Sequence, residues 1–385
     1  MPYANVSQDK RGALHAHGKF LRRSLTAMDL FSGAGGMSIG LEKAGFTLIY
    51  ANEVNKDAAA TYSYNFPHVH LETSDIRQVN VSRLNTDLEL PKVDLIAAGI
   101  PCQGFSTAGK RNPRDHRNQL YKEVLRFVRE FKPKFVVIEN VVGMMFAAKG
   151  LFVKRIESGL RELGYSVHCR ILSASSYGVP QRRKRLFIIG SSCRVSSKQL
   201  FPRAAKTRLS ASQALSDLSF LGVDAAAERY KRPPRSAYQK LMRADSSVLR
   251  NHRSPKHSQR VQTMFAAIPP GTNARSVFGE NYSGKRVRFK LHPRKPSNTL
   301  TTLPEDLIHY SQNRILTVRE MARLQSFPDS FVFLGPRTTG GPQRQNACPQ
   351  YTQVGNAVPP LLAEAVLTNL ADMVRQNYPP HDPDA

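Results

Sequence analysis

Two apolar, β-branched segments of this chain each end in a residue with a reactive side chain. The first leads into the turn Pro101–Ser106, which contains Cys102, and the second, about forty residues on, is Phe135–Val141, which contains Glu139. Such runs predict buried parallel strands, because a strand covered on both faces has continuous rather than alternating hydrophobicity. A thiol paired with a carboxylic acid suits attack on an electron-poor ring, where sulfur adds to carbon and the acid protonates a ring nitrogen. Two unrelated strand ends, one of them holding a buried cysteine, remain the alternative.

A glycine-rich turn near the N-terminus predicts a ligand with a nucleotide-like part. A short strand from Ala27 leads into Ser32–Gly36 (SGAGG), and an amphipathic helix is expected from Met37 to Ala44. Small residues let the backbone approach a ligand closely, and the helix N-terminus offers free N–H groups. The spacing matches neither the dinucleotide fingerprint nor a P-loop. Glu53 ends the next strand about twenty residues beyond the turn, where a carboxylate can accept both ribose hydroxyls.

These segments belong to an ordered series of motifs that resembles the DNA (cytosine-5)-methyltransferases of bacterial type. In chain order the motifs are Asp29–Gly36, Glu53, Asp75-Ile76, Gly99–Ser106, Glu139–Val141, Gln181–Arg185, Arg314–Asp329 and Gln353–Pro360. Two positions depart from the family pattern. Ile100 stands where an aromatic residue is usual, and Val54 stands where some relatives place a Trp, a residue that this chain lacks altogether.

The resemblance implies a role for each catalytic residue. Cys102 adds as a thiolate to C6 of cytosine, which turns C5 into an enamine carbon that can accept the methyl group of S-adenosylmethionine and leave S-adenosylhomocysteine. Glu139, with a pKa raised by a dry pocket, neutralises the charge at ring nitrogen N3. Arg185 is expected to bind the base carbonyl and Arg183 to steady Glu139. The residues expected to hold the cofactor are Phe31, Gly33, Gly35, Glu53, Asp75, Ile76, Leu120, Asn356 and Val358.

The charge distribution fits a partner of double-stranded DNA. The chain has 56 Lys and Arg against 29 Asp and Glu, a formal charge of +27. Residues 191–298 hold 22 of the basic and 5 of the acidic residues, and so +17 of that charge. Such a bias favours a polyanion. Candidate contact stretches are 250–253, 254–257 and 285–288. Because C5 lies inside the duplex, the base must be flipped out, and Gln103–Leu120 is expected to be the mobile loop that closes over it.

Length and periodicity predict two domains rather than one. We expect a flexible basic arm over residues 1–24 and an α/β, doubly wound, Rossmann-like catalytic and cofactor-binding domain over 25–190. A smaller, irregular target-recognition domain over 191–298 follows, and residues 299–385 return to complete the catalytic domain. The individual elements expected are a helix over 119–131, strands over 47–51, 135–139 and 186–190, a helix over 317–325 and a closing helix over 359–378. No purpose is evident for the loop 335–349.

The cysteines and the apolar segments bear on location. Cys102, Cys169, Cys193 and Cys348 are far apart and lack metal-ligand spacing, so we expect no metal site and a reducing cytoplasm. No signal peptide is recognised, because residues 1–24 lack an apolar core, and no stretch is expected to be long enough to span a membrane. The expected location is therefore the cytoplasm. The resemblance to bacterial enzymes implies a bacterial cell and association with the nucleoid, and the expected state is a monomer. No endonuclease-like domain is recognised, so a restriction endonuclease partner would be a separately encoded protein.

Two other functions stay open at this point. One is methylation of transfer RNA, which a branch of the same family performs, although the long basic insert fits DNA enzymes better. The other is a catalytically silent DNA-binding relative, which would need neither Cys102 nor the cofactor residues. A cysteine hydrolase is disfavoured because no histidine lies within the motifs.

Overall fold

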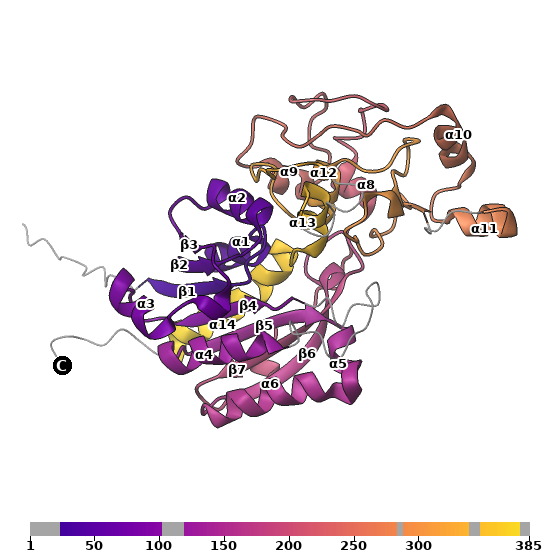
Figure 1. The fold of residues 1–385 in the computed structure, drawn as a ribbon. Coiled ribbons are helices and arrows are strands. Elements are labelled where there is room, and N and C mark those ends of the chain that lie inside the picture. Colours follow the sequence, from indigo (N-terminus) through magenta and orange to yellow (C-terminus); the bar gives the residue numbers. More distant parts are fainter. Residues whose placement is uncertain (1–23, 102–118, 283–287, 339–346, 378–385) are drawn as a thin grey trace, which may run out of the picture.

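The computed structural model describes residues 24–101, 119–282, 288–338 and 347–377, and these are the residues discussed below (Figure 1). Cys102, most of the loop predicted over 103–120 and nearly all of the predicted N-terminal arm lie outside the described residues.

A mixed seven-stranded sheet forms the centre of the larger half of the molecule, in the order β3-β2-β1-β4-β5-β7-β6 (Figure 1). Strands β1 to β5 are parallel, and β7 is antiparallel to both of its neighbours, β5 and β6. The strands are β1 Leu25–Leu30, β2 Phe46–Asn52, β3 His70–Glu72, β4 Leu95–Gly99, β5 Phe135–Val141, β6 Ser166–Ser173 and β7 Lys184–Ser191. The sheet with its helices confirms the predicted Rossmann-like α/β class.

Helices cover both faces of this sheet. Alternate residues of β5 show why: Val136 and Ile138 join the apolar core under α3, α4 and α6, whereas Phe135 and Val137 join the core under α1 and α14. The helices of this half are α1 Gly36–Lys43, α2 Lys56–Asn65, α3 Val81–Leu88, α4 Tyr121–Phe131, α5 Gly143–Phe146, α6 Leu151–Glu162 and α14 Pro360–Asn377.

Helix α1 is buried on more sides than its amphipathic pattern predicts. All residues from Gly36 to Leu41 are buried, because α14 returns from the C-terminal end of the chain and covers the face that faces away from the sheet. The two helices touch at Gly40, where an added Cβ atom would lie 2.5 Å from the Cβ atom of Ala363. The return of α14 confirms that a closing helix packs on the large domain.

The second half of the molecule consists of short helices and long connections above the sheet in Figure 1. Its elements are α8 Ala211–Leu215, α9 Ala237–Arg243, α10 Gln259–Ala267, α11 Ala274–Phe278, β8 Phe289–Lys290, β9 Leu307–Ile308, α12 Val318–Leu324 and α13 Gln350–Asn356. Helix α7 Ser197–Leu200 instead lies against α14, where Asn369 donates to the carbonyl of Gln199. Short 3-10 turns occur in both halves, at 76–78, 147–150, 174–176, 279–281 and 304–306. Leu215, Tyr238 and Met242 belong to the same apolar core as α1 and α14. Around α10 and α11, a separate small cluster forms on Phe265 and Ile268.

Several predicted elements have the expected limits. Helix α12 runs from Val318 to Leu324 between its N-cap Thr317, whose hydroxyl accepts from the backbone N–H of Glu320, and its C-cap Gln325. With its two caps it covers the predicted span 317–325. Strand β7 contains the predicted strand 186–190 but runs antiparallel to β5.

One expectation about membranes is wrong. The helical stretch Gln350–Gln376, which contains α13 and α14, is long and apolar enough to cross a membrane by length and composition. It is mostly buried inside the protein and packs on α1, which is the behaviour of a core helix.

Candidate active site

Glu139 lies near the C-terminal end of β5, beside the central strand β4. Its side chain is buried, and its Oε1 atom is 2.9 Å from Nε of Arg185. The register of the antiparallel pair explains the contact, because Arg185 of β7 stands opposite Val141, two residues from Glu139 and on the same face. Burial raises the pKa of Glu139, and the charges of Arg185 and Arg183 oppose that shift. This carboxyl is therefore suited to hold a proton in a closed site.

Both predicted arginines act on Glu139, because the charges of Arg185 and Arg183 both lower its pKa. The guanidinium in ion-pair contact with Glu139 is that of Arg185. Arg183 is buried and donates from Nη1 to the carbonyl of Leu300, at 3.0 Å, and from Nη2 to the carbonyl of Gly355, at 2.8 Å. Arg183, which immediately precedes β7, thus connects that strand to Leu300 and to the end of α13 at Gly355.

Asn140 connects the acid strand to the chain that leads into the predicted nucleophile. Its Nδ2 atom donates to the carbonyl of Ile100 at 3.2 Å, and its Oδ1 atom accepts from the backbone N–H of Val141. Ile100 immediately precedes Pro101, so this hydrogen bond fixes the start of the 101–106 turn relative to Glu139. Cys102 itself lies outside the described residues.

The glycine-rich turn makes an open cradle at the ends of β1 and β2. Phe31 and Gly33 both have φ of +57°, and Gly35 has φ of +101°. A Cβ atom on Gly33 would meet no atom within 4 Å, so open space lies beside this backbone, whereas one on Gly35 would lie 2.3 Å from the ring of Phe66. Gly35 is therefore required for packing, and Gly33 leaves room for a ligand.

The predicted ribose and adenine residues lie around this cradle. Glu53 Oε2 accepts from the backbone N–H of Gly33 at 2.9 Å, and burial raises the pKa of the Glu53 carboxyl. Asp75 caps a 3-10 turn, and its carboxylate also bonds the guanidinium of Arg77. Ile76, the next residue, is buried. A half-buried acid, an apolar residue and open space beside a glycine fit the sugar and base of S-adenosylmethionine.

The three remaining cofactor candidates lie on other elements. Leu120 precedes α4 and packs partly against the core beneath it. Asn356 ends α13, and the Val358 carbonyl would be 2.3 Å from a Cβ atom on Gly36. The closing motif therefore touches the glycine-rich turn, but Gly36 was not among the predicted site residues. In the sequence, the consecutive glycines at 35 and 36 could have indicated that another backbone segment packs directly on this turn.

Sequence reasoning also missed a set of fully buried charges beside α12. Arg314 donates twice to the carboxylate of Glu320, at 2.7 Å each, and Arg323 pairs with both Asp217 and Asp329. These residues are wholly inaccessible to solvent. Basic side chains that looked like surface charge in the scaffold motif are internal connections between α12 and the 191–298 segment.

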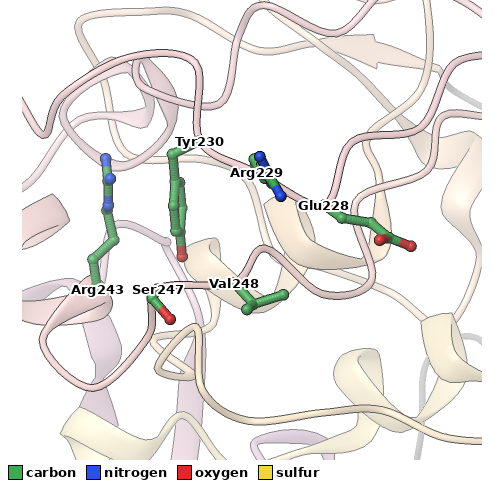
Figure 2. Close-up of a pocket in the computed structure, with 6 residues that line it drawn as sticks. All are labelled: Glu228, Arg229, Tyr230, Arg243, Ser247 and Val248. Carbon is green, nitrogen blue, oxygen red and sulfur yellow. The ribbon is translucent and has the colours of Figure 1, made fainter.

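The same network reaches the rim of a hollow of about 500 Å³ in the second half of the molecule. Figure 2 shows the guanidinium of Arg243 flat against the ring of Tyr230, at 3.7 Å from the ring centre. The Tyr230 hydroxyl donates to Asp329, and Arg243 also lies 3.4 Å from Asp217. These contacts hold the wall of the hollow to α12.

The candidate DNA-contacting stretches contain both internal and exposed residues. His252 is buried, its Nδ1 atom lies 2.9 Å from the Thr317 hydroxyl, and burial lowers its pKa to about 4. Ser254 is also buried and donates to the carbonyl of Gly222. Arg250 and Arg253 are exposed. Residues 285–287 lie outside the described residues.

Cysteines and metal ligands add no second site. Within the described ranges, Cys169, Cys193 and Cys348 are free thiols, and no group of three His, Cys, Asp or Glu side chains could hold a metal ion.

Comparison with known proteins agrees with this geometry. Residues 25–372 match the model of a family described as C-5 cytosine-specific DNA methylase. The chain is 38% identical over 371 residues to the Type II methyltransferase M.DdeI of Desulfomicrobium norvegicum, with 90% of this chain and 88% of that protein covered. It is 36% identical over 353 residues to M1.HphI of Haemophilus parahaemolyticus, with 89% and 86% covered.

Solved structures share the fold. A DNA modification methyltransferase encoded within an Escherichia coli prophage superposes with a TM-score of 0.76 at 26% identity, covering 91% of this chain and all of that one. The Entamoeba histolytica methyltransferase EhMeth, at 16% identity and a TM-score of 0.59, shows the fold alone. The family match spans the glycine-rich turn, the acid strand and the closing motif in one piece. The chain therefore belongs to the C-5 cytosine-specific DNA methylases, a family that uses S-adenosylmethionine, and is a DNA (cytosine-5-)-methyltransferase.

Proposed function

We propose that this enzyme methylates a flipped cytosine with Cys102 as the nucleophile and Glu139 as the acid. Arg185 pairs with Glu139 and donates to the base carbonyl, and Arg183 steadies Glu139 through its charge. The observation that carries the assignment is the buried ion pair between Arg185 and Glu139, next to the hydrogen bond from Asn140 to Ile100. It brings an acid with a raised pKa to the sheet edge where the chain turns toward Cys102.

The proposed reaction has two stages at the base. The thiolate of Cys102 bonds to C6 while Glu139 gives a proton to N3, which neutralises the ring and makes C5 nucleophilic. S-adenosylmethionine, when bound, supplies an electrophilic sulfonium methyl group. Loss of the C5 proton to solvent water then expels Cys102 from C6 as the thiolate. The N3 proton returns to Glu139, which restores the neutral aromatic ring. Arg185 donates through Nε to the Glu139 carboxyl and holds its orientation toward the base during both stages.

The cofactor pocket is proposed to consist of the cradle and the segments around it. Gly33 and Gly35 admit the methionine part, Glu53 accepts the ribose hydroxyls, and Asp75 and Ile76 bind adenine. Phe31, Leu120, Asn356 and Val358 complete the walls. The open space beside Gly33 and the carboxylate of Glu53 within hydrogen-bonding distance of its N–H support this arrangement.

The two halves of the molecule are proposed to divide catalysis from DNA reading. Residues 25–190, completed by 299–385, carry the chemistry, and residues 191–298 read the duplex, from which the base is flipped. The charge of +17 on 191–298 supports this division, since it favours phosphate contacts. The many side-chain bonds from Arg319 and Arg323 to this segment would hold it at a fixed orientation.

We also propose that this chain is the modification partner of a separately encoded restriction endonuclease and that it acts as a cytoplasmic, nucleoid-associated monomer without a metal. The Type II methyltransferases to which it is similar support the restriction partnership.

Bisulfite sequencing of DNA from a methylation-free bacterial host tests the proposal directly. We expect protected cytosines in one recurring sequence with the wild type and none with Cys102→Ser. Glu139→Gln should retain only a small fraction of the wild-type methylation. Full protection in the Cys102→Ser host would contradict the nucleophile. No protection by a soluble, folded wild-type chain would contradict the proposed activity on duplex DNA.

A further inference from the structure

The chain immediately after the acid strand exposes a large aromatic side chain. Phe146, at the end of α5, has 70% of its surface exposed, the largest fraction among the exposed large hydrophobic residues of the described chain. Leu151, at the start of α6, is 41% exposed. Met144, before this segment in the chain, and Phe152, after it, are both buried. The exposed segment is therefore held at both ends by the core beneath the sheet and does not project from a loose end.

The backbone between Met144 and Phe152 is strained. Ala148 and Lys149 have φ of +48° and +54°, and Gly150 follows with φ of +80°. For a residue with a Cβ atom, the left-handed region costs about 1 kcal/mol or more. Burial of apolar surface does not offset this cost at either position, because Ala148 and Lys149 are both exposed. Strain without a folding benefit is a feature of segments that contact a ligand.

Basic side chains surround the exposed apolar ones. Leu151, Lys154 and Arg155 lie at i, i+3 and i+4 on the first turn of α6 and therefore share one face of it. All three are exposed, as is Lys149 just before them. The nearest acid, Glu157, is bound by Arg161. We call Phe146, Lys149, Leu151, Lys154 and Arg155 the post-acid surface; its charge is complementary to a polyanion.

The post-acid surface lies close to the catalytic acid. Phe146 is the seventh residue after Glu139, so the Cα atoms of the two cannot be more than about 25 Å apart, and the helical turn of α5 shortens that span. One turn of a DNA duplex is about 34 Å long, so a base at Glu139 keeps its neighbouring base pairs within reach of Phe146. Figure 1 shows α5 at the edge where β5 ends, on the side that faces the second half of the molecule.

We propose that the post-acid surface binds the duplex beside the flipped cytosine. Phe146 and Leu151 lie against the apolar sugar and base edges of the minor groove, and Lys149, Lys154 and Arg155 contact the adjoining phosphates. Apolar side chains in a minor groove stabilise distorted duplexes, and basic neighbours add a salt-dependent attraction. This inference rests on the proposed position of the target base at Glu139, and it adds a contact made by the large domain to those expected from residues 191–298.

Duplex binding by variants of the full-length chain, with S-adenosylhomocysteine present, tests the inference. Phe146→Ala should raise the Kd for the duplex about tenfold, as expected for loss of an apolar anchor. Tyr64→Ala is the matched control, because Tyr64 is an aromatic residue with 56% exposure on α2, and its Kd should equal that of the wild type. Equal Kd values for Phe146→Ala and the wild type would overturn the proposal.

Two further variants separate contact from folding. Lys149→Gly relieves the left-handed strain, so its Tm should rise while duplex binding weakens; a higher Tm with unchanged binding would make the turn purely structural and overturn its role. The double variant Lys149→Gln, Lys154→Gln should lower the slope of log K against log salt by about 2. An unchanged slope would exclude the phosphate contacts. Wild-type methylation that depends on Cys102, together with unaltered binding by Phe146→Ala, would reject this surface and leave the proposed reaction intact.

Discussion

Two buried glutamates show how the same residue type acquires opposite chemistry. Glu320 receives two hydrogen bonds from Arg314 and one from the backbone N–H of Thr317, and these hold the pKa of its carboxyl well below the usual range despite burial. Glu139 makes an ion pair with Arg185, and burial raises its pKa. Glu320 is therefore a permanent anion that serves structure, whereas Glu139 is suited to hold the proton that the proposed reaction requires.

The raised pKa of Glu139 predicts the pH dependence of the enzyme. In the proposed reaction the protonated carboxyl is the active form, so the methyl-transfer rate should fall as pH rises through that pKa. Glu139→Gln cannot lose a proton, so its rate should be lower by about 10² to 10⁴ and should lack this alkaline fall. Single-turnover rates of both proteins between pH 6 and pH 10 make the comparison. The same alkaline fall in both would assign the titration to another group.

Val54 predicts a way to strengthen the cofactor site. It follows Glu53 directly, and 61% of its surface is exposed where a ring could cover adenine. Val54→Trp should tighten binding of S-adenosylmethionine about two- to tenfold, the range of an added aromatic stack. The chain has no Trp, so the new ring also reports binding by its fluorescence. Tyr64→Trp serves as the fluorescence control. If cofactor binding neither quenched the fluorescence of Trp in Val54→Trp nor showed a changed Kd, the adenine would not lie beside residue 54.

At the scale of elements, the sequence predicted those whose signals are local. Helix α12 has its N-cap hydroxyl at Thr317 and the matching acid at Glu320, and β5 has an unbroken apolar run, so both were found with nearly correct limits. The burial of α1 was not predicted in full, because the helix that covers it lies more than three hundred residues away in the chain. The contact of Arg185 with Glu139 depends on the register of an antiparallel pair, which the motifs alone do not specify.

The packing of α1 on α14 predicts contrasting effects for two glycine substitutions. Gly40→Ala would place a Cβ atom 2.5 Å from the Cβ of Ala363 and 2.8 Å from the backbone nitrogen of Glu364, so the helices must separate, at a cost of about 1–3 kcal/mol. Gly159→Ala, in α6, meets the end of the flexible Leu125 side chain and should be neutral or stabilising, because alanine favours helix. Urea unfolding of both variants provides the test; equal stabilities would contradict tight packing at Gly40.

At the scale of the whole molecule, much of the basic charge has a different use from the one that composition suggests. Arg314, Arg319 and Arg323 add to the +27, yet all three are fully buried and bond carbonyls or carboxylates. Composition could not separate them from exposed arginines, because their partners come from distant parts of the chain; Asp217 and Arg323 are 106 residues apart. The function was still predicted correctly, since the ordered motifs carried it and charge only supported it.

The buried pair of Arg323 with Asp217 and Asp329 predicts that the two halves of the molecule are joined by charges that cannot be removed singly. Arg323→Met removes the nearest guanidinium from two carboxylates in a dry interior. Only the longer contacts from Arg243 to Asp217, at 3.4 Å, and from Arg319 to Asp329, at 3.9 Å, remain. Breaking such a buried pair costs about 3–5 kcal/mol. The matched control is Arg375→Met, which removes an exposed partner of Asp372 and should cost about 1 kcal/mol or less. Urea unfolding measures both. Loss of these ion pairs should also disturb the orientation of the 191–298 segment. At temperatures where Arg323→Met remains folded, we therefore expect weaker duplex binding but unchanged binding of S-adenosylhomocysteine. Equal unfolding free energies for the two variants would show that this network does not stabilise the junction.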